Sequence, residues 1–150
     1  MDAGSVCSSF SRGARGSILS RLLFDTTFLI DAERSGEALD DAVGDDDDGA
    51  IAAITVAELR VGVLLATGRN RAARLAFLED VLQVIPILDY DREVAEAHAE
   101  LLGHVRRQGR PRGAHDLLIA ATAKAAGRTV VSADDTAFAG MPGVQARTHR

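Results

Sequence analysis

The sequence predicts an α/β fold with three layers and a mainly parallel sheet, on the strength of three observations. Short apolar runs of strand length, such as residues 21–25, alternate with longer stretches in which apolar residues recur at helical spacing, such as residues 55–66. Strands that alternate with helices usually form a parallel sheet. Acidic residues also stand where several apolar runs end. Ligands of open α/β sheets bind at the ends of the strands, so the same pattern predicts where a functional site lies.

Length and composition indicate one globular domain. The chain has 150 residues, of which 47% are hydrophobic and 26% are charged, an ordinary balance for a globular protein. Residues 1–20 are rich in Ser, Gly and Arg and lack the apolar core of a secretory signal. We therefore expect a flexible leader there and a domain over residues 21–148. No apolar run approaches the roughly 20 residues of a membrane helix, so we expect a cytoplasmic protein that does not associate with membranes.

Charge and cysteine content narrow the function classes. The net charge of −5 argues against a protein that coats DNA without sequence preference, because such binding depends on a basic surface. It does not exclude a nuclease whose own site is acidic. Cys7 is the single cysteine, so an intrachain disulfide is impossible. Lys124 is the single lysine, so any mechanism that needs a lysine has one candidate.

In the first half of the chain we expect two strands and three helices. The pattern predicts a strand over 21–25, a helix capped by Thr26 or Thr27, a solvated acidic loop over 35–48, a strand over 50–54, a helix over 55–66 ended by Gly68, and a helix capped by Asn70. The loop carries acidic patches at 40–41 and 45–48. Four successive aspartates repel one another, and they lack the alternate ligand spacing of a calcium loop.

The second half repeats the alternation. We expect an edge strand or extended connection over 84–88 because it contains Pro86, a long helix capped by Asp89 or Asp91 that ends at 106–109, an almost wholly apolar helix over 115–126 ended by Gly127, a strand over 129–132, a helical turn over 134–139, and a last strand within 143–148. The helix over 115–126 should be central, since its apolar residues cover nearly its whole circumference.

Four acidic positions are the candidate site, and each also has a purely structural interpretation. Asp25 follows the first strand, where an aspartate often caps a helix. Glu58 completes the Ser/Thr-x-x-Glu pattern of a capping box that begins at Thr55. Asp116 stands in the first turn of the apolar helix, where the dipole favours an acid. Asp134 and Asp135 follow the strand over 129–132, and two acids are more than capping requires; we prefer Asp134, with Asp135 second.

Together these acids favour a metal site. In a parallel sheet all four positions fall at one edge, and carboxylates so close raise each other's pKa. A hard cation relieves this repulsion, and a set of oxygen ligands suits Mg²⁺ or Mn²⁺. Such a centre activates water and neutralises charge on a phosphodiester.

Basic residues and histidines have smaller predicted roles. Arg110 and Arg112 belong to a basic cluster just before Asp116, which is either a solvated helix end or a clamp for RNA phosphates. The four histidines do not form a metal-binding set. His115 adjoins Asp116, and we expect it to be exposed or to contact a metal ligand rather than the metal itself.

Four segments together resemble a PIN domain, and most closely the VapC-type toxins of bacterial type II toxin–antitoxin pairs. They are Phe24-Asp25-Thr26-Thr27, Thr55-x-x-Glu58-Leu59-Arg60-x-Gly62, the run from Gly113 to Ala121, and Val131-Ser132-Ala133-Asp134. The resemblance extends over roughly residues 22–144 and rests on the order and spacing of these segments. The sequence differs from many relatives after Asp134, where Ala137-Phe138 stands in place of an Asp-Phe pair.

The resemblance implies an endoribonuclease that depends on Mg²⁺ or Mn²⁺ and cuts RNA with metal-activated water. It assigns the acids to Asp25, Glu58, Asp116 and Asp134, with Asp135 as the alternative for the fourth. It implies that Thr26 orients Asp25 and that Ser132 supplies the polar side chain usual before the last acid. It further implies a homodimer and a cognate antitoxin that lies over or near the acids.

Two other functions remain open from the sequence. An aspartyl-phosphate phosphatase also places an aspartate after its first strand, but it would want a second aspartate where Thr27 stands and a lysine at the site. A PIN-like module that binds RNA or protein without cleavage is the other alternative. No acid of the predicted set is missing, and we therefore favour the nuclease.

Overall fold

The computed structural model describes residues 20–37, 39–44, 48–134 and 136–148. In chain order the elements are β1 (Arg21–Phe24), α1 (Thr26–Ser35), α2 (Leu39–Val43), β2 (Asp48–Ala52), α3 (Ala53–Leu65), α4 (Gly68–Val84), β3 (Ile87–Leu88), α5 (Arg92–Gln108), α6 (Ala114–Ala126), β4 (Thr129–Ser132) and β5 (Ala146–Thr148). The predicted leader, residues 45–47 of the acidic loop and Asp135 lie outside the described residues, apart from Ser20 at the end of the leader.

The described strands form one parallel sheet in the order β3-β2-β1-β4-β5. The chain runs outward from β1 through β2 to β3, then returns to the other side of β1 for β4 and β5. β1 is therefore the switch point, and the carboxyl ends of β1 and β4 lie side by side, with Phe24 in register with Val131. In such sheets this is the place where ligands bind. The predicted α/β class and parallel sheet are confirmed.

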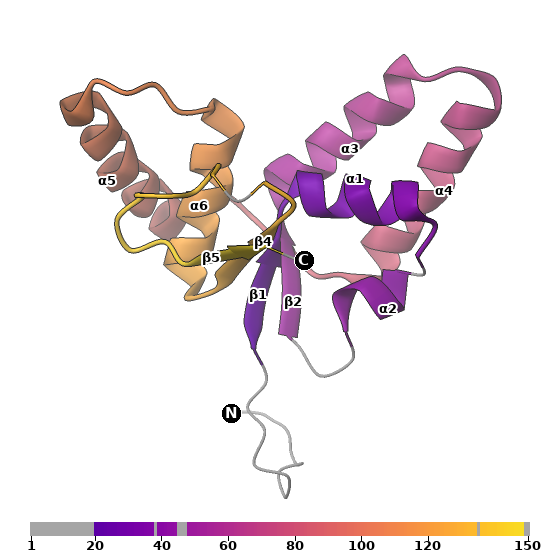
Figure 1. Cartoon of the computed structure of the whole chain (residues 1–150), viewed down its shortest axis with the longest axis horizontal. Helices are drawn as coiled ribbons and strands as arrows, with labels where there is room; N and C mark the ends of the chain where they lie inside the picture. The colour runs from indigo at the N-terminus through magenta and orange to yellow at the C-terminus, as the bar shows by residue number, and fades with distance from the viewer. Residues whose placement is uncertain (1–19, 38, 45–47, 135, 149–150) are drawn as a thin grey trace, which may run out of the picture.

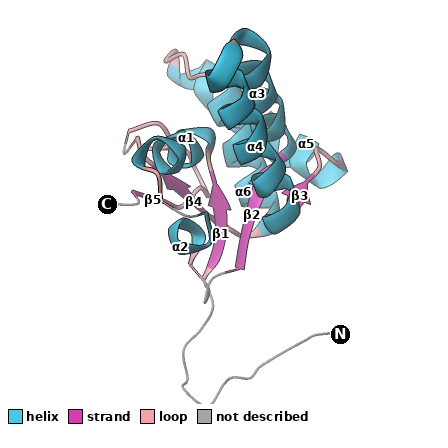
Figure 2. Cartoon of the chain, turned by 90° about the vertical axis from the view of Figure 1, so that its right-hand side faces the viewer, coloured by secondary structure: helices cyan, strands magenta, loops and turns pink. Residues whose placement is uncertain are grey.

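Helices cover both faces of the sheet and make three layers (Figures 1 and 2). Alternate residues of the central strand point to opposite faces: Leu23 packs in a core with α5 and α6, while Leu22 and Phe24 pack in a second core with α1, α3 and α4. Burial on both faces explains why the strands read as continuous apolar runs instead of alternating ones.

Several predicted boundaries need correction. The segment 35–48 is not loop throughout, because α2 occupies residues 39–43. α3 begins at Ala53, two residues before Thr55, and its first turn has no side-chain cap. Gly68 begins α4 instead of ending α3, and Asn70 does not cap it. The short helical turn predicted over 134–139 is wrong for the described part of that range, since residues 134 and 136–139 contain no helix and 137–139 form a turn.

Other boundaries agree closely with the prediction. Asp91 caps α5 by accepting a hydrogen bond from the Val94 N–H, and Gly109 and Gly127 end α5 and α6 in the left-handed conformation. β3 is an edge strand, as Pro86 indicated. α6 buries residues around most of its circumference, as expected of a central helix.

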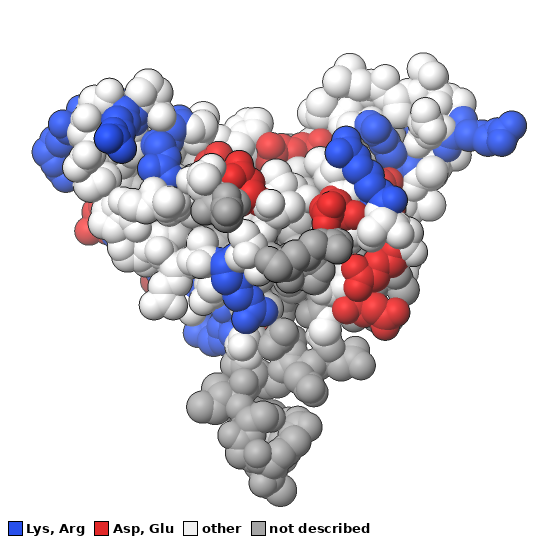
Figure 3. Space-filling view, viewed as in Figure 1, with Lys and Arg blue, Asp and Glu red and all other residues white. Residues whose placement is uncertain are grey.

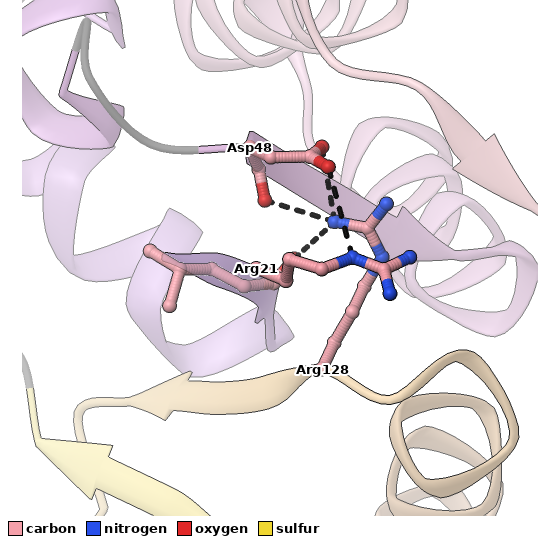
Figure 4. Close-up of polar contacts among 4 residues, drawn as sticks. Arg21, Asp48 and Arg128 are labelled. Carbon is pink, nitrogen blue, oxygen red and sulfur yellow. Dashed lines mark hydrogen bonds and ion pairs between the residues drawn. The ribbon is translucent and has the colours of Figure 1, made fainter. Parts of the chain in front are cut away.

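The amino ends of three strands are fastened by one carboxylate and two arginines (Figure 4). Arg128 lies just before β4 and donates from Nη1 to the carbonyls of Leu22 and Asp48, at 3.2 and 2.8 Å, and to Asp48 Oδ1 at 3.1 Å. Arg21 Nε lies 3.9 Å from Asp48 Oδ2. This arrangement ties β1, β2 and β4 together at the end of the sheet away from the acidic positions.

Candidate active site

The carboxyl ends of the strands open between two helical arms. α3 and α4 rise on one side and α5 and α6 on the other (Figure 1). The surface is hollowed between them, with acidic side chains near its floor and basic side chains on both arms (Figure 3). The four predicted acids come from elements that meet here: Asp25 follows β1, Asp134 follows β4, and Glu58 in α3 and Asp116 in α6 come from the two arms.

Asp25 is both a helix cap and a buried acid. Its Oδ1 accepts from the Phe28 N–H at 2.8 Å, which makes Asp25, and not Thr26 or Thr27, the N-cap of α1. Asp25 is buried, with 2% of its surface exposed. Burial raises the pKa of Asp25, even though hydrogen bonds from Ser132, Phe28 and Thr27 favour the ionised form. A cap alone would not require this costly location.

Thr27 is a site residue that the sequence analysis missed. Its hydroxyl lies 2.8 and 3.0 Å from the two carboxylate oxygens of Asp25, 3.1 Å from Ser132 Oγ, and accepts from the Ala133 N–H at 3.1 Å. It therefore joins the end of β1 to the end of β4. A cap was one of the two interpretations of Asp25 from the sequence, and with Asp25 as the N-cap Thr27 falls at the second position of α1.

Thr26 serves a different acid from the one predicted. Its hydroxyl donates to Glu58 Oε1 at 2.6 Å and lies 3.3 Å from Thr55 Oγ1, so Thr27 and not Thr26 contacts Asp25. The other carboxylate oxygen of Glu58, Oε2, lies 2.8 Å from His115 Nδ1. The capping box predicted from Thr55 and Glu58 does not form, because α3 begins earlier. Glu58 is held instead by side chains of α1 and α6.

Asp116 shows that the predicted acids gather. Burial raises its pKa, and repulsion from Asp25, Glu58 and Asp134 raises it further, while Arg112 lowers it. The other three acids therefore all lie within electrostatic range of this one carboxylate. Asp116 stands in the first turn of α6, whose cap Gly113 provides no side-chain hydrogen bond.

Asp134 is the most exposed of the four. Its Oδ1 accepts from the N–H and the hydroxyl of Thr136, both at 2.9 Å, and these bonds lower its pKa. Ser132 Oγ accepts from the Asp134 N–H at 3.0 Å, which fixes the turn after β4. Asp135, the alternative fourth acid, lies outside the described residues.

The two candidate RNA-binding arginines differ in their surroundings. Arg112 is half-buried, and its Nη2 donates to the Ala137 carbonyl at 2.8 Å. It joins the segment before α6 to the turn after Asp134. Arg110 is exposed. The role of both in RNA binding stays a prediction.

The chemistry of the donor set fits a hard cation. Within the described ranges, no three acid, histidine or cysteine side chains converge tightly enough to form a metal-binding group as they stand. The acids nevertheless repel one another, and burial disfavours the ionised forms of Asp25 and Asp116. A divalent cation among oxygen donors would relieve both effects, which is what the carboxylate set predicts.

The lysine that a phosphatase would need is engaged elsewhere. Lys124 Nζ pairs with Glu100 Oε1 of α5 at 3.2 Å. The position where that mechanism wants an aspartate holds Thr27, whose hydroxyl contacts Asp25. These contacts disfavour the aspartyl-phosphate alternative.

Comparison of the sequence and the structure with known proteins identifies a family and several relatives. The sequence matches the PIN domain family over residues 22–144. It is 40% identical to ribonuclease VapC5 of Mycobacterium tuberculosis over 124 residues, which cover 81% of this chain and 87% of that protein. It is 34% identical to ribonuclease VapC4 of the same organism, covering 85% of this chain and 96% of VapC4. The crystal structure of VapBC-5, a member of the VapBC family of toxin–antitoxin systems from M. tuberculosis, matches with a TM-score of 0.67 and 36% identity, covering 84% and 94% of the two chains.

Proposed function

Because the chain belongs to the PIN-domain family, in the branch of the VapC ribonucleases, we propose that it is an endoribonuclease toxin of a type II toxin–antitoxin pair and that its activity depends on a divalent metal. The observation that carries the proposal is the electrostatic convergence of Asp25, Glu58 and Asp134 on Asp116. A set of carboxylates at the switch point of a parallel sheet is a suitable site for phosphodiester hydrolysis.

Asp25, Glu58, Asp116 and Asp134 are the residues proposed to hold the metal, for which Mg²⁺ or Mn²⁺ is the best match to oxygen donors. The bound cation supplies an activated water and neutralises charge on the phosphodiester. The chain's own residues orient these donors. Thr27 holds the Asp25 carboxylate, Ser132 fixes the turn that carries Asp134, and the acids are available to accept a proton from the attacking water.

RNA and an antitoxin are the proposed partners. Acidic side chains near the floor of the hollow, with basic ones on the arms, suit a polyanion that is drawn in by the arms and cut at the floor (Figure 3). A cavity of about 310 Å³ continues from Glu58 between α1, α3 and α4, and it is lined by Arg34, Arg74 and Phe77 among others. An antitoxin segment seated near the acids would block the substrate.

We further propose that the protein is a homodimer that acts in the cytoplasm. Val61, Leu64 and Leu65 expose apolar side chains along α3, and such residues are often covered by a second subunit. None of the described helices is long and apolar enough to cross a membrane. Light scattering of the purified protein tests the dimer.

The decisive experiment is cleavage of purified total RNA with Mg²⁺ or Mn²⁺, and again with excess EDTA. We expect cutting that EDTA abolishes and that Asp116→Asn lacks. If the wild-type protein binds neither metal nor cuts RNA in the presence of the metal, the proposed activity is wrong, and a binding module without cleavage becomes the better description.

A further inference from the structure

The exposed imidazole of His115 contacts one of the four predicted acids. The side chain of His115 is 57% exposed, yet its Nδ1 lies 2.8 Å from Glu58 Oε2. An ionised carboxylate can only accept hydrogen bonds, so in this contact the imidazole must donate from Nδ1. The position of the proton on the ring is thus set by Glu58.

Glu58 also accepts a hydrogen bond from Thr26, which precedes it in the sequence, whereas His115 follows it. The Thr26 hydroxyl donates to Oε1 at 2.6 Å. The two oxygens are therefore held separately, one from the first turn of α1 and the other from the first turn of α6. Each carboxylate oxygen has two acceptor sites, so each still has one available for a further ligand.

Without these two hydrogen bonds, the Glu58 side chain would favour a rotamer that points away from the other acids. Its side chain is 25% exposed and has several rotatable bonds, so water is accessible to it. Asp116 and Glu58 repel one another, as the raised pKa of Asp116 shows. Repulsion and side-chain entropy both favour a rotamer that points to solvent. The bonds from Thr26 and His115 oppose them.

The position of His115 in the helix makes this contact specific to the site. His115 and Asp116 are neighbours in the first turn of α6, so the same backbone segment places an acid and the donor that holds a second acid. His115 does not cap the helix, since the N-cap is Gly113. In the described structure its hydrogen bond goes to Glu58 across 57 residues of sequence.

We propose that His115 is a positioning residue that fixes the Glu58 carboxylate for metal binding, an inference that rests on the proposed function. Groups that hydrogen-bond to metal ligands typically contribute 10- to 100-fold to metal affinity or activity. His115 does not itself need to touch the metal or the RNA. An asparagine at this position retains a donor near the place of Nδ1 and should replace it in part.

The test compares His115→Ala, His115→Asn and His98→Ala with the wild-type protein. Mn²⁺ affinity is measured by calorimetry and RNA cleavage as a function of Mn²⁺ concentration. We expect His115→Ala to weaken Mn²⁺ binding about 10-fold and His115→Asn to remain within about threefold of wild type. His98 is the matched control, because its ring also forms a hydrogen bond with a side chain, Tyr90 Oη at 3.0 Å. His98 lies on α5, away from the acids. It should bind and cut as wild type does.

A double-mutant cycle with Glu58→Gln separates positioning from general damage. If His115 acts through Glu58, adding His115→Ala to Glu58→Gln should change Mn²⁺ affinity less than about twofold, because residues that share one interaction are not additive. A full effect in that background, or wild-type Mn²⁺ affinity in His115→Ala, overturns the inference while the nuclease assignment stands. A wild-type protein that neither binds Mn²⁺ nor cuts RNA overturns both.

Discussion

The two ends of the parallel sheet place carboxylates in opposite electrostatic surroundings. At the amino end, Asp48 faces Arg128 and Arg21 and is matched by their charge (Figure 4). At the carboxyl end, Asp25 and Asp116 are partly or wholly buried, and their neighbours include other acids that raise the pKa of each. The Arg112 guanidinium has the opposite charge and lowers the pKa of Asp116.

The difference is the one expected between an acid that stabilises the fold and the acids proposed to bind a metal. Folding alone would favour the arrangement around Asp48, whose carboxylate faces two arginines and accepts a hydrogen bond from Arg128 Nη1. Like charges gathered in a partly buried site reduce stability unless something else neutralises them. Strained acids of this kind often mark a functional site, and the cost at this end of the sheet supports the proposal that Asp25 and Asp116 bind a ligand.

The largest effect is expected from an Asp→Asn substitution at the carboxyl end of the sheet, compared with the same substitution at the amino end. Asp116→Asn should reduce RNA cleavage by about 100-fold or more while the fold survives, because the amide relieves repulsion from Asp25 and Glu58. Asp48→Asn is the matched control: cleavage should remain at the wild-type rate. Its side chain is 45% exposed, so the loss of stability should stay below about 1 kcal/mol. Equal cleavage by the two variants would remove the distinction between the ends.

Arg128→Ala should produce the largest loss of stability at the structural end. The side chain is 10% exposed and donates to two carbonyls and one carboxylate. Its removal should lower the free energy of unfolding by about 2 kcal/mol, measured by urea denaturation, with unchanged cleavage per folded molecule. Arg128→Lys should lose less stability, because it keeps the positive charge. It should still be less stable than the wild-type protein, because it lacks the planar guanidinium group. A variant with wild-type stability would show that the arginine does not fasten these strands.

A smaller effect is expected where hydrogen bonding supports the acids. Thr27→Val removes the hydroxyl that contacts Asp25 and accepts from Ala133. We expect cleavage to fall about 10-fold, as for other groups that orient metal ligands. Thr122→Val is the control, because that hydroxyl donates to the Leu118 carbonyl within α6. If both valine variants cut equally well, Thr27 has no role in positioning Asp25.

The smallest effect should be seen in the pH dependence of stability without metal. An unfolded aspartate titrates near 3.8, and the folded pKa values of Asp25 and Asp116 lie above this. Over the window above 3.8 the folded state holds protons that the unfolded state has lost, so the free energy of unfolding should fall as pH rises. Asp134 has the opposite sign, but it is exposed and contributes little. Thermal melts across pH 4–7 should show this slope, Mn²⁺ should reduce it, and Asp116→Asn should flatten it. A slope unchanged in that variant would contradict the assignment.

Much of the fold follows from local pattern. Apolar runs identified β1 and β4, Pro86 identified the edge strand, and Gly109 and Gly127 identified helix ends, because each of these signals is a property of a few neighbouring residues. The boundaries around α2, α3 and α4 were misplaced. The starts of α3 and α4 lack the side-chain caps that a sequence pattern can reveal.

The sequence by itself determined which residue types stand at the ends of the strands, and hence that acids meet at the switch point of a parallel sheet. Tertiary structure decided which side chain serves which acid. Thr26 and Thr27 are adjacent, but successive helical residues point about 100° apart, so one reaches Glu58 and the other reaches Asp25 and Ser132. The bond from His115 to Glu58 likewise depends on how α6 packs beside α3. Such contacts join residues far apart in the chain, and their geometry is fixed only when the helices have packed on the sheet.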